Sequence, residues 1–68
     1  MSNEIRTPVC LRQVARSKRL HAQSARAYLS RLDSQNIAER EECEAEIEKL
    51  ELEAWALETE ATQLEQQS

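Results

Sequence analysis

The sequence contains no glycine and no phenylalanine, and it has one proline, one tryptophan and one tyrosine among 68 residues. β-Sandwiches, dinucleotide-binding domains and phosphate-binding loops need glycine for positive φ or close backbone approach, so these folds are excluded. The chain is instead 40% hydrophobic and 32% charged, with long stretches of Ala, Leu, Glu, Gln and Arg. This composition is typical of long helices and predicts an all-α protein.

Long apolar segments are also missing. No run approaches the ~20 apolar residues that cross a bilayer, and the N-terminus lacks the charged-then-apolar order of a secretory signal. We therefore expect a cytoplasmic protein without membrane insertion. A domain of this size buries little apolar surface alone and commonly needs disulfides, a metal or self-association.

The few residues suited to metal or nucleophile chemistry are scattered. Cys10 and Cys43 form no CxxC motif, and His21 is the only histidine, so neither a metal site, a cofactor nor a catalytic centre is expected and the protein is predicted not to be an enzyme. In the hairpin described below, the two cysteines lie roughly 28 Å apart along the helices, beyond disulfide reach. Both are expected to act as small buried or half-buried hydrophobes.

Two polar segments mark where helices begin and end. Thr7-Pro8 is a helix start, because Thr caps an orphan amide and Pro fits the first turn. The cluster of residues 33–36 is the only turn-competent one inside the chain, and Asn36 with Glu39 resembles a capping box. We predict one domain over residues 7–68, after a flexible arm at 1–6, with a helix over 8–33, a turn at 34–36 and a helix over 37–66. An uninterrupted helix over 8–66 remains possible, since no glycine enforces the turn.

Both helices carry a heptad seam, in which apolar or small residues recur at alternating steps of four and three. Folded antiparallel, residues whose numbers sum to 72 face each other, and small side chains meet large ones, as Ala22 meets Leu50. The predicted fold is therefore a coiled-coil-like antiparallel two-helix hairpin. The seam residues are Leu11, Ala15, Lys18, Ala22, Ala25, Leu29 and Leu32 in the first helix and Cys43, Ile47, Leu50, Ala54, Leu57, Ala61 and Leu64 in the second.

The charge is divided between the halves: residues 1–33 carry a net +5 and residues 34–68 a net −9. Either the halves neutralise each other, or one of them meets a charged partner. Residues just after the seam predict three ion pairs, Arg26–Glu44, Arg19–Glu51 and Arg12–Glu58, which select the register more than they stabilise it. Lys18 breaks the seam opposite Ala54 and is expected to reach Glu51 or Glu58. On the other side of the seam, we expect His21 to approach Glu53 and Tyr28 to approach Glu46.

Several apolar residues lie outside the seam, on the back of each helix or beside it. They indicate either a homodimer that forms a four-helix bundle or a surface for another protein, and both can hold. An acidic face of Glu44, Glu48, Glu51 and Glu58 with Trp55 as anchor suits a basic partner. The candidate dimer or partner-binding residues are Trp55, Tyr28, Leu52, Leu20, Val14, Glu48, Glu51 and Glu58.

With its Thr7-Pro8 opening, the basic first helix RQVARSKRLHAQSARAYLSRLD and the acidic second helix EREECEAEIEKLELEAWALE, the chain resembles the small quorum-sensing anti-activators of Mu-like Pseudomonas phages over residues 7–66. The resemblance implies a dimer of helical hairpins that binds the DNA-binding region of a LuxR-type activator in the host cytoplasm. It also implies a second possible target, the ATPase that extends type IV pili.

Two other classes of function stay open. A nucleic-acid-binding module could use the arginines of the first helix, although the predicted ion pairs occupy three of them, so no direct nucleic-acid contact is expected. A structural coiled-coil or assembly chaperone would self-associate without a host target. An anti-CRISPR role belongs to the same inhibitor class as anti-activation, and the sequence does not separate the two.

Overall fold

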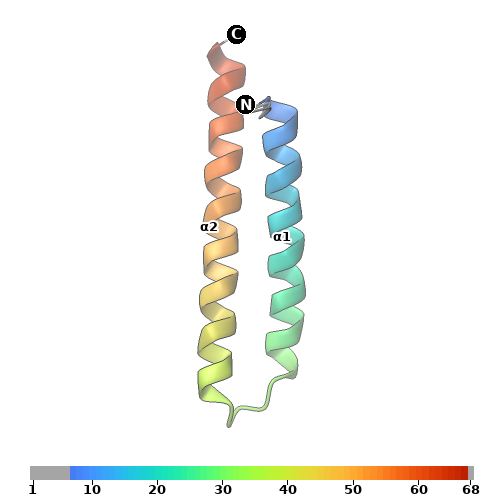
Figure 1. Cartoon of the computed structure of the whole chain (residues 1–68), viewed down its shortest axis with the longest axis vertical. Helices are drawn as coiled ribbons and strands as arrows, with labels where there is room; N and C mark the ends of the chain where they lie inside the picture. Colours follow the sequence, from blue (N-terminus) through green and yellow to red (C-terminus); the bar gives the residue numbers. More distant parts are fainter. Residues whose placement is uncertain (1–6, 68) are drawn as a thin grey trace, which may run out of the picture.

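The computed structural model describes residues 7–67 and consists of two α-helices, α1 (Pro8–Arg31) and α2 (Ile37–Gln67). The helices run antiparallel and are joined at one end of a rod of 51 × 27 × 14 Å (Figure 1). The predicted all-α hairpin is confirmed, and the alternative of one uninterrupted helix is wrong. The predicted arm at residues 1–6 lies outside the described residues.

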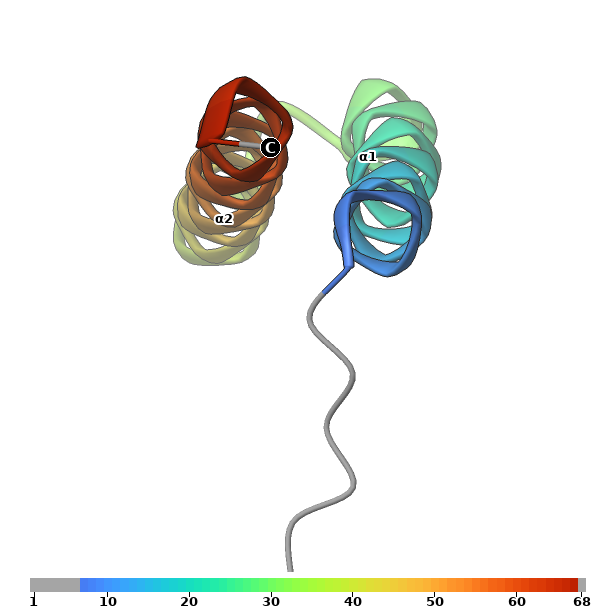
Figure 2. The same cartoon turned by 90° about the horizontal axis from the view of Figure 1, so that it is seen from above.

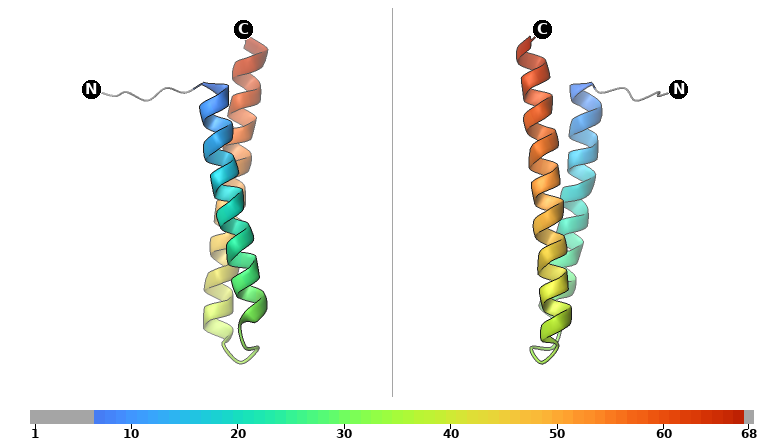
Figure 3. Two further views of the ribbon diagram at one scale, coloured as in Figure 1. Left: turned by 90° about the vertical axis from the view of Figure 1, so that its right-hand side faces the viewer. Right: turned by 60° about the vertical axis from the view of Figure 1, so that its left-hand side comes forward.

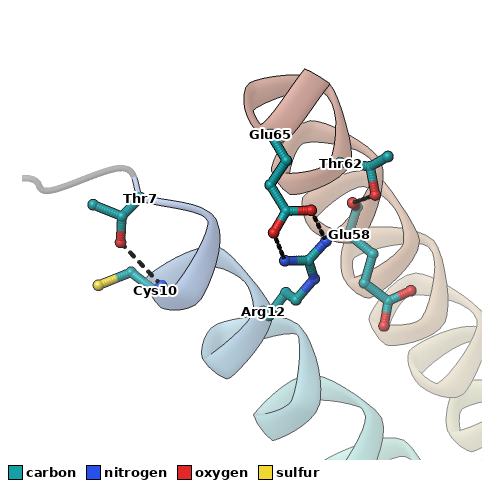
Figure 4. Close-up of polar contacts among 6 residues, drawn as sticks. All are labelled: Thr7, Cys10, Arg12, Glu58, Thr62 and Glu65. Atoms are coloured by element: carbon teal, nitrogen blue, oxygen red, sulfur yellow. Dashed lines mark hydrogen bonds and ion pairs between the residues drawn. The ribbon is translucent and has the colours of Figure 1, made fainter. Parts of the chain in front are cut away.

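The start of α1 follows the local chemistry of Thr7-Pro8. The backbone of Thr7 is extended, and its Oγ1 accepts a hydrogen bond from the N–H of Cys10 at 3.2 Å (Figure 4). Pro8 occupies the first turn, where a missing N–H costs nothing. Cys10 is exposed, which corrects the expectation that both cysteines are at least half-buried. The reason is position, since Cys10 precedes the seam residue Leu11 by one residue and points away from α2.

The first helix ends two residues earlier than predicted. Leu32 has extended backbone angles (φ −72°, ψ 141°), so α1 stops at Arg31 and the connection covers residues 32–36. Within the connection the carboxylate of Asp33 accepts from the N–H of Gln35 at 3.3 Å, and the N–H of Asn36 donates to the carbonyl of Asp33 at 3.0 Å. This compact turn uses the polar cluster to reverse the chain without glycine. The second helix begins at Ile37 as predicted and ends one residue later than predicted.

The core is a single seam of small and aliphatic side chains between the helices. Ala22 packs against Ile47 and Leu50, and the half-buried Ala25, Leu29 and Cys43 cover this cluster toward the loop. An alanine opposite a larger side chain, as Ala22 is opposite Leu50, lets the two backbones approach. Figures 2 and 3 show the helices side by side, crossing at a shallow angle. The buried residues are Leu11, Ala15, Ala22, Ile47, Leu50, Ala54 and Ala61, all of them seam positions.

Cys43 also contributes a polar contact to this seam. Its thiol donates to the carbonyl of Ala25 at 3.3 Å, and both cysteines of the chain are free thiols. A half-buried cysteine at this position behaves as the small hydrophobe that the sequence predicts.

Candidate protein-binding surface

Three arginines of α1 and three glutamates of α2 form ion pairs along one edge of the hairpin, which we call the arginine edge (Arg12, Arg19, Arg26, Glu51, Glu58 and Glu65). Arg12 donates two hydrogen bonds to Glu65 at 2.6 and 2.7 Å (Figure 4). Arg19 donates two to Glu58, both at 2.7 Å, and Arg26 pairs with Glu51. Each of the first two pairs is bidentate, the geometry in which a guanidinium binds a carboxylate best.

The ion pairs lie on the predicted edge, but the predicted partners are wrong by one heptad. Arg12, for example, binds Glu65 and not Glu58. The physical reason is the direction of the side chains, because every Cα–Cβ bond tilts toward the N-terminus of its helix. In an antiparallel pair an α1 arginine therefore leans toward the C-terminal end of α2, while an α2 glutamate leans the opposite way. The two converge only when the glutamate lies further along α2.

These contacts perturb the titration of the glutamates. The hydrogen bonds from Arg19 lower the pKa of Glu58, and those from Arg12 lower the pKa of Glu65, both against a smaller opposing effect of desolvation. The side chains of Arg19 and Glu58 remain 46% and 39% exposed, so solvent and salt screen the attraction. The arginine edge therefore specifies register more than it adds stability.

The opposite edge has a different character. The Lys18 Nζ donates to Glu53 at 3.0 Å and lowers the pKa of that carboxyl, and the Tyr28 hydroxyl donates to Glu39 at 3.0 Å, which raises the pKa of the phenol. The predicted contact of Lys18 with Glu51 or Glu58 is therefore wrong. Arginines occupy both of those carboxylates, so the lysine leans over Ala54 to the other side.

Two further expectations concern this edge, and the one for Tyr28 is wrong. Tyr28 binds Glu39 in the first turn of α2 and not the predicted Glu46. The capping-box pattern predicts that the Glu39 carboxylate binds Asn36, whereas in the structure this carboxylate accepts from Tyr28. The predicted partner of His21 is Glu53, whose carboxylate is bound to Lys18. His21 itself is exposed.

The shifted pairing leaves the loop-proximal half of α2 with a surplus of negative charge. Between Ile37 and Glu48 there are six glutamates and one arginine, and the ion pairs of the described residues engage none of those glutamates. Residues spaced by four and three positions lie on one side of a helix, so the acidic and apolar residues with this spacing form a stripe along α2. The stripe is about 27 Å long at ~1.5 Å per residue. We call it the acidic stripe; its residues are Ile37, Glu41, Glu44, Glu48, Leu52 and Trp55.

Large apolar side chains stand at both ends of the acidic stripe. Ile37 is 63% exposed at the loop end, and Leu52 and Trp55 are 60% and 61% exposed at the other. Of the predicted acidic face, Glu44 and Glu48 belong to this stripe, whereas Glu51 and Glu58 are bound to arginines. Ile37 and Glu41 were not among the predicted candidates. The seven-residue spacings from Ile37 to Glu44 and from Glu41 to Glu48 were the signal that could have found them.

The remaining predicted residues lie elsewhere. Leu20 is 55% exposed on the back of α1, while Val14 and Tyr28 are 47% and 53% exposed on the edge opposite the arginines. The structure therefore brings Trp55, Leu52 and Glu48 together, and separates them from the α1 candidates.

An open groove lies beside the acidic stripe at the loop end. It measures about 380 Å³, and its lining includes the aliphatic side chains of Leu29 and Ile47 next to Glu44. The guanidinium of Arg40 closes one side, donating to the carbonyl of Leu29 at the end of α1 at 3.4 Å. Arg26 and Ser30 complete the lining.

The described part of the chain, residues 7–67, contains no cluster of three His, Cys, Asp or Glu placed to hold a metal ion. Neither of its helices combines the length and apolar character required to traverse a membrane. No protein-family model matches the chain, and no curated protein or solved structure is significantly similar to it. What the protein binds is therefore inferred from its surface.

Proposed function

We propose that the protein is a non-enzymatic, phage-encoded inhibitor that acts in the cytoplasm of the host by binding the DNA-binding region of a LuxR-type transcription activator. The acidic stripe is the observation that carries this proposal. Within residues 7–67, no lysine or arginine forms an ion pair with its glutamates, which stand in a row flanked by exposed apolar anchors. That combination suits a basic helical surface.

A helix-turn-helix domain presents such a surface. Its recognition helix and the neighbouring backbone amides carry basic and polar groups that contact phosphates and base edges. Glutamates at positions 41, 44 and 48 would pair with those basic groups, and α2 would then occupy the space of the DNA backbone. Because phosphate contacts supply much of the affinity for DNA, covering a few of them is enough to release the promoter.

The apolar residues add the contact energy that exposed charges lack. Surface ion pairs alone contribute little, whereas buried aromatic side chains dominate interface energetics. Trp55 and Leu52 are one helical turn apart and form one anchor, and the groove between Leu29 and Ile47 receives a second. The charges thus align the partner, and the anchors hold it.

The distribution of arginines argues against the alternative of a nucleic-acid-binding module. Arg12, Arg19 and Arg26 are each bound to a glutamate, and Lys18 is bound to Glu53. Phosphates would have to displace these carboxylates, and the α2 glutamates would repel the approaching strand.

The proposal also includes self-association into a four-helix bundle. Seven large hydrophobic side chains of the described residues are at least 47% exposed, which is a large apolar surface in contact with water for a hairpin of two helices. A second copy that covers some of them would increase the buried apolar area and hence the stability.

A gel-shift titration tests the inhibition. A purified quorum-sensing activator is bound to its promoter fragment, and the protein is added in increasing amounts. We expect the shifted band to disappear at stoichiometric to micromolar protein. An unchanged shift at all concentrations would refute the proposal, as would a shift of the DNA by the protein alone.

A matched pair of variants tests the surface. Glu41→Lys/Glu48→Lys reverses two charges on the acidic stripe, and Glu42→Lys/Glu46→Lys makes the same change on the other side of α2. We expect the first variant to lose inhibition by at least about tenfold and the second to retain most of it. Equal losses would show that net charge, and not this stripe, governs binding.

A further inference from the structure

The side of α1 that faces away from the arginine edge carries no charge over more than five helical turns. Every position of three adjacent helical rows between Cys10 and Tyr28 is uncharged, and every one of these side chains is exposed. The rows together span about 100° of the helix circumference, the width of a typical packing face. We call this the neutral face; its residues are Cys10, Gln13, Val14, Ser17, Leu20, His21, Ser24, Ala27 and Tyr28.

The corresponding rows of α2 differ. They include Glu39, Glu42, Glu46, Glu53 and Glu60, as the solvent-facing side of a helix in water usually does. On α1 the charges are confined to the seam, the arginine edge, Arg16 and Arg31. Depletion of charge with retention of apolar side chains such as Leu20 is typical of the core of a protein interface.

We infer that the neutral face binds the neutral face of a second copy, so that the two α1 helices pack antiparallel at the centre of the dimer. This inference rests on the self-association included in the proposed function and identifies its surface. Residues whose numbers sum to 38 would then face each other across a two-fold axis. The resulting layers are Cys10 with Tyr28, Val14 with Ser24, and Ser17 with His21, each occurring twice.

Every layer of this alignment sets a smaller side chain against a larger one. The hairpin core uses the same rule, with Ala22 against Leu50. The layers use six of the nine residues of the neutral face, and they leave Arg31 outside. Leu20 of each copy lies beside the axis, where its 55% exposed side chain meets its symmetry mate.

Charge disfavours two other ways to join two copies. Packing α2 against a second α2 would set rows of glutamates against each other, at a cost that like charges impose in any interface. Packing through the arginine edge would bury ion pairs that solvent now covers. The neutral face avoids both, and it lies on the side of the hairpin away from the acidic stripe, which stays free for a target.

Sedimentation velocity of the purified protein tests the surface. His21→Glu places two negative charges next to the axis, and Gln23→Glu makes the same charge change outside the neutral face. We expect the dimer dissociation constant of His21→Glu to increase about a hundredfold or more, and that of Gln23→Glu to stay unchanged. Both variants should remain fully helical by circular dichroism. A monomeric wild-type protein, or a His21→Glu dimer as tight as wild type, would overturn the inference.

Cysteine cross-linking tests the register. In a Cys10→Ser background, Val14→Cys and Ser24→Cys proteins are mixed and oxidised with diamide. We expect a disulfide-linked heterodimer, and no covalent dimer from either variant alone, because like positions lie about 15 Å apart along the axis. Equal cross-linking of each variant with itself would contradict the alignment. Neither experiment involves DNA or an activator, so failure here is distinct from failure of the gel-shift test.

Discussion

Exchanging a large and a small side chain across one layer of the seam tests the packing directly. Leu50 is 6% exposed and packs against Ala22, which is 1% exposed. Leu50→Ala removes buried carbons and leaves a cavity, so we expect it to lower the free energy of unfolding by about 2–3 kcal/mol. The loss lies toward the low end of the range for such changes because two helices without a further layer can move together.

The reverse change overfills the same layer. Ala22→Leu forces the helices apart and is expected to cost about 1–3 kcal/mol. In the double variant, the leucine introduced at position 22 occupies the space that the side chain of Leu50 vacated. We therefore expect the double variant to be more stable than the sum of the two losses predicts, by at least about 1 kcal/mol.

A control exchange uses a different layer. Leu57 faces Ala15 in the predicted register, about 10 Å along the helix from the layer of Ala22 at ~1.5 Å per residue. Ala22→Leu combined with Leu57→Ala should be additive. Urea unfolding followed by circular dichroism, at one fixed protein concentration, gives the free energies. If both double variants are equally additive, Ala22 and Leu50 do not share a layer and the packing described above is wrong.

Three further predictions concern the polar contacts. The double variant Arg19→Glu/Glu58→Arg exchanges the two charges of an observed ion pair, so it should melt at a higher temperature than Arg19→Glu/Glu51→Arg, which exchanges the charges of the pair predicted from the sequence. The opposite order of melting temperatures would support the pairing one heptad earlier. Arg19 lowers the pKa of Glu58, so the stability that this pair contributes is present above the unfolded-state pKa of Glu58 and is lost as pH falls through the folded-state pKa. The free energy of unfolding of Glu58→Gln should therefore depend less on pH in this acidic range than that of the wild type. An unchanged pH profile would contradict the assignment. The pKa of Tyr28 is raised by Glu39, so ultraviolet titration of this single tyrosine should show a midpoint above 10.0 that falls in Glu39→Gln and in urea.

The helices and their antiparallel order were predictable because the signals are local. Thr7-Pro8 starts α1 through a hydrogen bond over three residues, and the polar cluster at 33–36 supplies the turn. The early end of α1 was not predictable from the cluster alone. It depends on Leu32, an apolar, half-buried residue whose backbone leaves the helix.

The seam was predictable for a different reason. Heptad spacing is a property of one helix, and the hydrophobic effect is not directional, so the residues on the apolar face are buried with any compatible partner. The predicted seam positions accordingly include every buried residue of the described chain. The exposed candidates, such as Trp55, are the apolar residues that remain once the seam positions are assigned.

The two helices, their seam and the edge on which the charges meet can therefore be predicted from the amino-acid sequence. Which glutamate each arginine binds is known only from the folded hairpin, because that choice depends on the opposite tilt of side chains on antiparallel helices. The difference is one heptad, yet it moves the arginines toward the C-terminus of α2, where Arg19 binds Glu58. It leaves Glu44 among the glutamates of the acidic stripe, which is the surface that we propose for a basic partner.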